Sequence, residues 1–201
     1  MTVTVIDYGG GNIGSVVNML KRVGSDVAVV REPAEIASSE RILLPGVGAF
    51  DRGVSLLKET GFFEPIRAFA VSGRPVLGIC LGMQLLADSS EEGELRGLGL
   101  IPGAARRFAA KPGLRIPHMG WNAVVPRDHE PLLDGIAEEN RFYFVHSYHV
   151  EPADESHVAA TTGYGSSFVS MIRRDNVVGA QFHPEKSHDF GKTLLKNFAA
   201  A

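Results

Sequence analysis

Cysteine is nearly absent from this chain, since Cys80 is the only one among 201 residues. A single cysteine excludes an internal disulfide and any zinc site built from several cysteine ligands. We therefore expect neither a metal ion nor another cofactor. A thiol that stays reduced fits a cytoplasmic protein, because that compartment keeps thiols reduced.

An excess of positive charge and a long apolar run are also missing. The chain has 20 basic and 23 acidic residues, for a formal net charge of −3. This balance argues against a nucleic-acid partner, although residues 104–118 form a locally basic stretch. No apolar run approaches the roughly 18 residues of a membrane span. The apolar run at residues 2–6 has no basic residue before it, so we expect neither a signal peptide nor contact with a membrane.

Short apolar segments alternate with helix-like ones in the first half of the chain. The helical pattern at 12–24 has Asn12 as its N-cap and Gly24 as its stop signal. Such alternation predicts a parallel sheet covered by helices on both faces. The expected strands are 2–7, 26–30, 41–46 and 74–79, and the second helical region is 54–73, interrupted near Gly61.

The second half of the chain has a different pattern, with successive strand-like segments and a closing helix at 186–201. This indicates an antiparallel or mixed extension of the same sheet. We predict an α/β fold with an open, mostly parallel (mixed) sheet flanked by helices on both faces. No repeat or linker divides it, so residues 1–201 are expected to form one domain. The strand-like segments are 141–150, 157–162, 167–174 and 176–184.

Cys80 lies in the sequence GICLG, where an apolar strand meets a helical pattern. A nucleophile at a sharp strand-to-helix turn adopts a strained backbone conformation, and glycines two residues to either side relieve the crowding. Amides at the start of the helix favour a thiolate. The pattern thus predicts an exposed, activated sulfur, while the alternative is a small buried hydrophobic residue.

Two further motifs supply what a cysteine nucleophile needs. In AQFHPEKS, His183 can take and return a proton, and Glu185 can orient its ring. In LLPGVGAF, the amides of Val47 and Gly48, with that of Leu81, can bind a developing oxyanion. Read singly, the first motif is also compatible with a surface loop and the second with an ordinary turn.

Together and in this order, PGVGAF, GICLGMQ and FHPE resemble the class I glutamine amidotransferases. The resemblance covers almost the whole chain. It implies the class I amidotransferase fold and a catalytic triad of Cys80, His183 and Glu185. It also implies hydrolysis of glutamine through a γ-glutamyl thioester, with ammonia released to a synthase partner.

A closer resemblance is to the glutaminase subunits of imidazole glycerol phosphate synthase, carried by DYGGGNIGSV, HMGWN, FYFVHSYHV and FHPEKS in addition to the motifs above. It implies a heterodimer with a (β/α)₈ cyclase. The cyclase uses the ammonia to make imidazole glycerol phosphate and AICAR in histidine biosynthesis.

The resemblance also implies roles for residues outside the triad. Substrate contacts are expected from Gln84, from Glu92 at the α-amino group, and from Ser147 with its neighbours His146 and Tyr148. Residues expected to face the cyclase are Asn12, Trp121, Asn122 and Lys186.

Three alternatives remain open from the sequence. One is a glutaminase of another class I enzyme, such as that of pyridoxal phosphate, carbamoyl phosphate or purine synthesis. Another is a stand-alone cysteine peptidase or γ-glutamyl hydrolase. The last is a binding domain that keeps the fold without catalysis, against which the complete triad argues.

Overall fold

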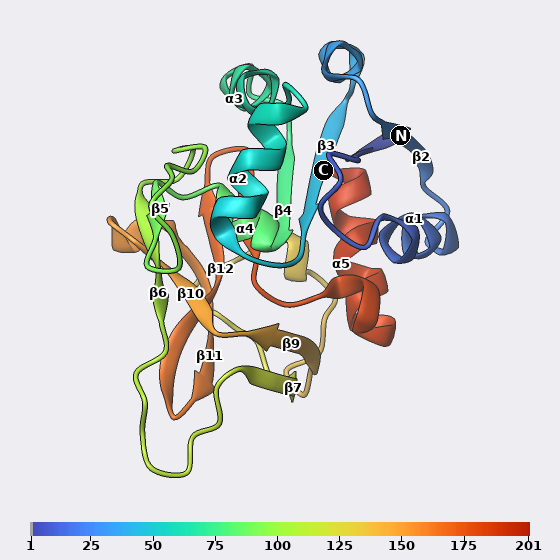
Figure 1. Ribbon diagram of the computed structural model, residues 1–201. Helices are drawn as coiled ribbons and strands as arrows, with labels where there is room; N and C mark the ends of the chain where they lie inside the picture. The colour runs from blue at the N-terminus through green and yellow to red at the C-terminus, as the bar shows by residue number, and fades with distance from the viewer. Residues whose placement is uncertain (1) are drawn as a thin grey trace.

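The computed structural model describes residues 2–201, which are built around an eight-stranded sheet in the order β2-β1-β3-β4-β13-β12-β11-β8 (Figure 1). The first five strands in this order run parallel, and the last three continue the sheet antiparallel. Their bounds are β1 Thr2–Ile6, β2 Asp26–Val30, β3 Arg41–Gly46, β4 Val76–Cys80, β8 Val125–Pro126, β11 Val158–Tyr164, β12 Ser166–Arg174 and β13 Val177–Ala180.

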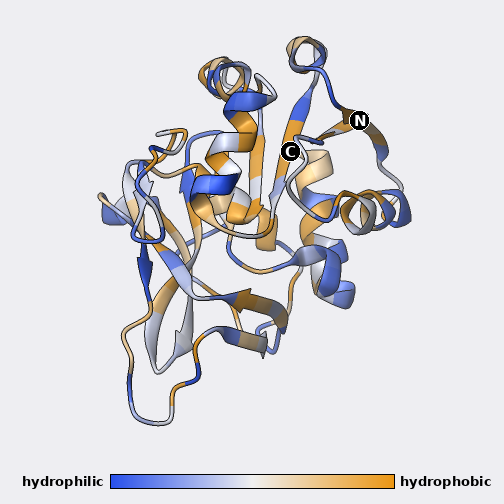
Figure 2. Cartoon of the chain, in the orientation of Figure 1, coloured by the Kyte–Doolittle hydropathy of each residue, from blue (hydrophilic) through white to orange (hydrophobic). Residues whose placement is uncertain are grey.

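Helices cover both faces of this sheet, as the α/β prediction requires (Figure 1). Successive residues of β3 point to opposite faces, so that Ile42 and Leu44 pack in one core and Leu43 in the other. Strand β4 is buried along its whole length and is mostly hydrophobic in Figure 2. The helices are α1 (Ile13–Arg22) and α5 (His188–Ala200) on one face, and α2 (Phe50–Glu59) and α3 (Phe63–Val71) on the other, with the short α4 (Leu81–Leu85) following β4.

Two small sheets lie beside the large one, and they correct the expected strand 141–150. That segment forms two strands, β9 (Phe142–His146) and β10 (Tyr148–Pro152), which separate at Ser147. Strand β9 pairs with β7 (His118–Asn122), whereas β10 pairs with β6 (Gly103–Arg107), which in turn pairs with β5 (Ser89–Ser90). The apolar pattern runs on through both strands because each buries one face, so it does not mark the change of sheet.

The other predicted helices and strands are present, but several begin or end at different residues than expected. Asn12 caps α1, accepting a hydrogen bond from the Ser15 amide, and Gly24 follows the helix with a positive φ. The break at Gly61 separates α2 from α3, but α2 begins at Phe50, earlier than the expected 54. The expected strand 176–184 ends at Ala180 because the chain then leaves the sheet towards a 3₁₀ turn, Pro184–Lys186, that precedes α5. Further 3₁₀ turns span Pro33–Ser38, Pro131–Leu133 and Glu155–His157.

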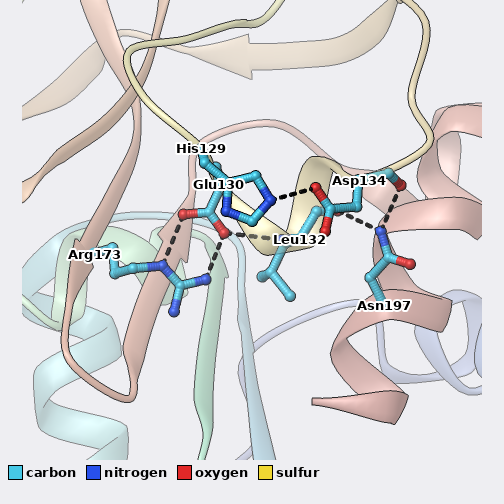
Figure 3. Close-up of polar contacts among 6 residues, drawn as sticks. All are labelled: His129, Glu130, Leu132, Asp134, Arg173 and Asn197. Atoms are coloured by element: carbon cyan, nitrogen blue, oxygen red, sulfur yellow. Dashed lines mark hydrogen bonds and ion pairs between the residues drawn. The ribbon is translucent and has the colours of Figure 1, made fainter.

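Hydrogen bonds connect the 3₁₀ turn Pro131–Leu133 and its flanking residues to strand β12 and helix α5 (Figure 3). The buried Glu130 carboxylate accepts two hydrogen bonds from Arg173 on β12 and one from the Leu132 amide. On the other side, Asn197 of α5 donates to the carbonyls of Leu132 and Asp134. The connection between β8 and β9 is therefore held against the sheet and a helix. Among residues 2–201, no helix has the length and apolar character to cross a membrane.

Candidate active site

Three neighbouring strands of the large sheet end at the same edge and bring the motifs together. Strand β4 lies between β3 and β13, with Cys80 opposite Gly46 and Ile79 opposite Ala180. The loop after β3 carries Val47 and Gly48, and the segment after β13 carries His183. Ligands of open α/β sheets bind at this carboxyl edge. The topology thus explains how segments far apart in the chain meet.

Cys80 stands at the turn between β4 and α4 in the strained conformation that the sequence predicts. Its φ is 56° and its ψ is −111°, a region that L residues rarely adopt. The turn is tight because Gly82 packs directly on the neighbouring strand β3, where an added Cβ would collide with the Leu44 carbonyl oxygen. A Cβ on Gly78 would lie 2.6 Å from the Gly82 carbonyl oxygen. Both glycines are required for this approach.

The exposure expected for the sulfur is wrong, because Cys80 is only 7% exposed. Cys80 and the residues around it line a pocket of about 310 Å³. The volume suits a small ligand. The lining residues are Val47, Gly48, Cys80, Leu81, Gln84, Glu92, Pro117, Val145, His146, Ser147, Tyr148 and His183.

His183, which lines the pocket, forms a buried pair with Glu185. Nδ1 of His183 lies 2.7 Å from Oε1 of Glu185. Within residues 2–201, Nε2 of His183 is buried and has no hydrogen-bond partner. Burial alone would lower the pKa of His183, but its interactions with the Cys80 sulfur and the Glu185 carboxylate outweigh burial and raise the pKa to about 9. The imidazole is therefore mostly protonated at neutral pH.

The backbone around His183 is fixed by Ser187, which the sequence analysis did not single out. The fully buried Ser187 hydroxyl donates to the His183 carbonyl (2.6 Å) and accepts from the Tyr143 amide (3.0 Å). The His183 amide donates to the Tyr143 carbonyl at 2.8 Å. Strand β9 thus holds the segment that carries the imidazole. The serine follows FHPEK directly, so its position was visible in the sequence, although its contacts were not.

The expected oxyanion residues surround the sulfur. Leu81 is the first residue of α4 and follows Cys80 directly. Across the pocket, Gly48 has φ 98° and Val47 is 49% exposed.

The expected substrate residues all line the pocket, and the side chains of three of them make hydrogen bonds within the protein. Gln84 donates from Nε2 to the Tyr148 carbonyl and to Oε1 of Gln181, both at 3.1 Å. Glu92 accepts from the Phe50 amide at the start of α2. Both ring nitrogens of His146 are engaged, with Tyr148 and with His118, so the ring can bind a ligand only by breaking one of these bonds.

The four residues expected to face a partner differ in their surroundings. Trp121 is 54% exposed and packs edge-on against Tyr143. Lys186 is exposed and lies 5.5 Å above the Tyr143 ring. Asn12 is exposed and caps α1. The Asn122 side chain is instead engaged within the protein by Gly163 and Ala123.

Gln181 is the main site residue that sequence reasoning missed. It is fully buried, and its Nε2 lies 3.9 Å from the Cys80 sulfur as a weak donor. Its position two residues before His183, on the same face of an extended segment, was the available signal. Among residues 2–201, no group of three or more His, Cys, Asp or Glu side chains is placed to hold a metal ion.

Comparison with known proteins agrees with this geometry. The family model described as glutamine amidotransferase class-I matches residues 4–201. The chain is 47% identical over 197 residues to imidazole glycerol phosphate synthase subunit HisH 2 of Pseudomonas aeruginosa, covering 98% of each chain. It is 46% identical over 199 residues to imidazole glycerol phosphate synthase hisHF, chloroplastic, of Arabidopsis thaliana, covering 98% of this chain and 33% of that one.

Solved structures show the same fold at low sequence identity. A crystal structure of a glutamine amidotransferase has a TM-score of 0.77 at 21% identity, covering 99% of both chains. The structure of PurLQS from Thermotoga maritima has a TM-score of 0.74 at 21% identity, covering 98% of this chain and 96% of that one. The chain belongs to the class I glutamine amidotransferase family, and its predicted fold class is confirmed.

Proposed function

We propose that this protein hydrolyses glutamine to glutamate and ammonia as the glutaminase subunit of an imidazole glycerol phosphate synthase. The observation that carries the proposal is one pocket that holds a strained cysteine beside an imidazole paired with a buried carboxylate. The relatives named HisH support the choice among amidotransferases, because their similarity extends over nearly the full length.

In the first half of the reaction, the Cys80 thiolate attacks the side-chain carbonyl carbon of glutamine. The protonated His183 donates its proton to the nitrogen as the carbon–nitrogen bond breaks, and ammonia leaves. Glu185 holds the ring through Nδ1, so that Nε2 carries the proton towards the reacting atoms. The product on the enzyme is a γ-glutamyl thioester at Cys80.

In the second half, water attacks the thioester and His183 takes its proton. The carbon–sulfur bond breaks, glutamate leaves, and the thiolate and imidazolium are restored. Both tetrahedral intermediates carry negative charge on oxygen, which the amides of Leu81 and of Val47 or Gly48 stabilise. One such donor contributes roughly 3 kcal/mol to transition-state stabilisation.

The residues that line the pocket support the proposed substrate contacts. Glu92 meets the α-amino group with the carboxylate oxygen that Phe50 does not use. Ser147, with the backbone beside it at His146 and Tyr148, meets the α-carboxylate or amide ends. Gln84 lies one turn into α4 and faces the substrate side chain.

The proposed partner is a (β/α)₈ cyclase that receives the ammonia and makes imidazole glycerol phosphate and AICAR. Exposed Trp121 and Met119 on β7 provide an apolar anchor, and the exposed Asn12 and Lys186 provide polar contacts. The match to about a third of the Arabidopsis hisHF chain supports a partner encoded in the remainder of that chain. We also propose a cytoplasmic location, because a reaction that depends on one free thiolate is favoured where thiols stay reduced.

The test is ammonia release from glutamine with and without a candidate cyclase. We expect release that depends on the cyclase and is abolished in Cys80→Ala, while the mutant still copurifies with the cyclase. A peptidase or γ-glutamyl hydrolase would act without the partner. Equal ammonia release by wild type and Cys80→Ala would refute the proposal.

The partner surface needs its own test. Trp121→Ala should weaken association with the cyclase at least tenfold, because exposed aromatic anchors carry much of the affinity of an interface. Val71→Ala is the matched control, since Val71 is 86% exposed on α3, at the end of the molecule away from β7 (Figure 1). Equal dissociation constants for the two variants would place the interface elsewhere.

A further inference from the structure

Two buried histidines lie side by side next to the pocket wall and have no part in the triad. His118 on β7 and His146 on β9 are directly opposite each other in the antiparallel pair. Nδ1 of His118 lies 3.1 Å from Nε2 of His146, and both residues are almost fully buried.

Aromatic rings enclose both imidazoles. His118 is stacked between Phe144 at 4.8 Å and Tyr164 at 4.0 Å, measured between ring centroids. His146 packs against Phe108 and Phe168 at 5.1 and 5.2 Å. Burial in this apolar box lowers the pKa of His118 to about 4 and that of His146 to about 3. Both rings are therefore neutral at neutral pH, and each has one donor and one acceptor nitrogen.

The partners of these rings determine which nitrogen carries the proton. Nδ1 of His146 lies 2.7 Å from the Tyr148 carbonyl oxygen, which can only accept. This nitrogen must donate, so Nε2 of His146 accepts. It follows that His118 donates from Nδ1 and accepts at Nε2.

Asn122 adds a further donor at the start of this series of hydrogen bonds. Its Nδ2 donates to the Gly163 carbonyl and its Oδ1 accepts from the Ala123 amide, which fixes the orientation of the side-chain amide. Nδ2 also lies 3.4 Å from Nε2 of His118, the nitrogen that must accept. Asn122, His118 and His146 therefore each donate to the next group, and the Tyr148 carbonyl is the final acceptor.

The last acceptor is part of the active site. The Tyr148 carbonyl also accepts from Gln84, which donates to Gln181, whose Nε2 lies 3.9 Å from the Cys80 sulfur. With both donors in place, the two lone pairs of the carbonyl are occupied. Losing the imidazole donor would free this carbonyl and, with it, the Gln84 amide that it holds.

We propose that His118 and His146 are positioning residues, which through one-way hydrogen bonds fix the Tyr148 carbonyl and thereby the Gln84 and Gln181 side chains beside Cys80. Their part in glutamine hydrolysis rests on the proposed function, whereas their effect on the Cys80 sulfur does not. Two apolar residues could fill this space without burying polar groups, whereas the two imidazoles supply hydrogen bonds that lead to the Tyr148 carbonyl.

The direct test is the tautomer of each ring, read from imidazole ¹⁵N shifts in the wild-type protein. We expect both His118 and His146 as neutral Nδ1–H tautomers at pH 7. An Nε2–H tautomer or a charged ring at either position would overturn the proposal, and this measurement requires no variant and no partner.

The functional test compares His146→Leu, which removes the donor, with His146→Asn, whose amide can replace Nδ1. For His146→Leu we expect kcat/KM for glutamine to fall about tenfold, the worth of one hydrogen bond, and His146→Asn to recover most of it. Phe168→Leu is the control, because it loosens the same box without removing a hydrogen bond. It should lower thermal stability and leave kcat/KM unchanged.

Alkylation of Cys80 by iodoacetamide gives a readout that does not depend on glutamine, and the single cysteine makes it unambiguous. The rate should change severalfold in His146→Leu, return in His146→Asn and stay at the wild-type value in Phe168→Leu. If His146→Leu fails to fold, His118→Leu removes the preceding hydrogen bond, the one to Nε2 of His146, and His118→Asn is its rescue variant. The change expected there is in the same direction and smaller, because Nδ1 of His146 still donates to the Tyr148 carbonyl. Wild-type rates in the leucine variant, or equal changes in it and Phe168→Leu, would leave the histidines a packing role only. Absence of glutaminase activity in the wild type together with the expected alkylation pattern would refute the proposed function and retain the positioning role.

Discussion

Nδ1 of His183 lies 2.7 Å from Oε1 of Glu185, and both side chains are almost completely buried. Only one residue, Pro184, separates them, and its ring restricts the backbone between the pair. The carboxylate therefore orients the imidazole and favours its charged form.

Replacing Glu185 with glutamine should change the rate and its pH dependence together. Because Glu185 and Cys80 raise the pKa of His183 to about 9, losing the carboxylate lowers this pKa. We expect kcat to fall by roughly 10² to 10⁴, and the alkaline limb of kcat/KM to move to lower pH. Ammonia release between pH 6 and 10 measures both. A reduced rate with an unmoved alkaline limb would show that the carboxylate does not set the protonation of His183.

The same pair makes stability depend on pH. A histidine whose pKa is higher in the folded state than its unfolded value near 6.5 stabilises the fold most below pH 6.5. That contribution is lost as the pH rises through about 9. The free energy of unfolding from urea titrations should therefore decrease between these values in the wild type. In Glu185→Gln the decrease should be smaller, and an equal slope in both proteins would contradict the assignment.

Two substitutions at Cys80 separate the effect of backbone strain on stability from the role of the sulfur in catalysis. Cys80→Ala and Cys80→Gly both remove the sulfur and should both abolish ammonia release. Alanine keeps a Cβ at φ 56°, whereas glycine adopts this conformation without strain. Glycine loses more backbone entropy on folding than alanine, which offsets part of the strain that it relieves. We therefore expect the unfolding free energy of Cys80→Gly in urea to exceed that of Cys80→Ala by about 1 kcal/mol. If the alanine variant is the more stable, the turn is not strained.

This turn was largely predictable, because its determinants are local. Gly78, Cys80 and Gly82 are close in the sequence, and their spacing indicated the strained conformation before any fold was known. His183 and Glu185 were found for the same reason, since they form a short motif. The low exposure of the sulfur was not predictable, because the residues that cover Cys80 come from distant loops.

The contacts of Gln181 and His118 could not be predicted in the same way. The hydrogen bond between Gln181 and Gln84 depends on β13 lying beside β4, and the pair of His118 with His146 depends on the register of β7 against β9. Hydrophobic periodicity gives strands but not their partners. For the same reason, the expected strand 141–150 concealed the break at Ser147, where the chain passes from one small sheet to the other.

Gly82→Ala should disrupt the nucleophile turn. The added methyl group would collide with the Leu44 carbonyl oxygen, so β3 and α4 must separate. We expect a loss of about 2 to 3 kcal/mol in unfolding free energy and little remaining ammonia release. Gly14→Ala in α1 is the matched control, since a Cβ there meets nothing within 4 Å. It should gain about 0.5 kcal/mol, as alanine does over glycine in a helix, and similar losses in both variants would contradict the steric argument.

The ion pair of Glu130 and Arg173 should matter more to stability than those at the surface (Figure 3). The Glu130 side chain is 3% exposed, so removing Arg173 leaves a buried carboxylate without its main partner. Arg173→Leu should therefore lower the unfolding free energy by about 3 kcal/mol at pH 7. Arg127→Leu removes an exposed pair with Glu155 and should cost less than about 1 kcal/mol.

The second substitution Glu130→Leu in the Arg173→Leu background should restore much of the loss, because it removes the unpaired charge. If the double variant is as unstable as Arg173→Leu, packing of the arginine stem and not its charge holds the Pro131–Leu133 turn to the sheet.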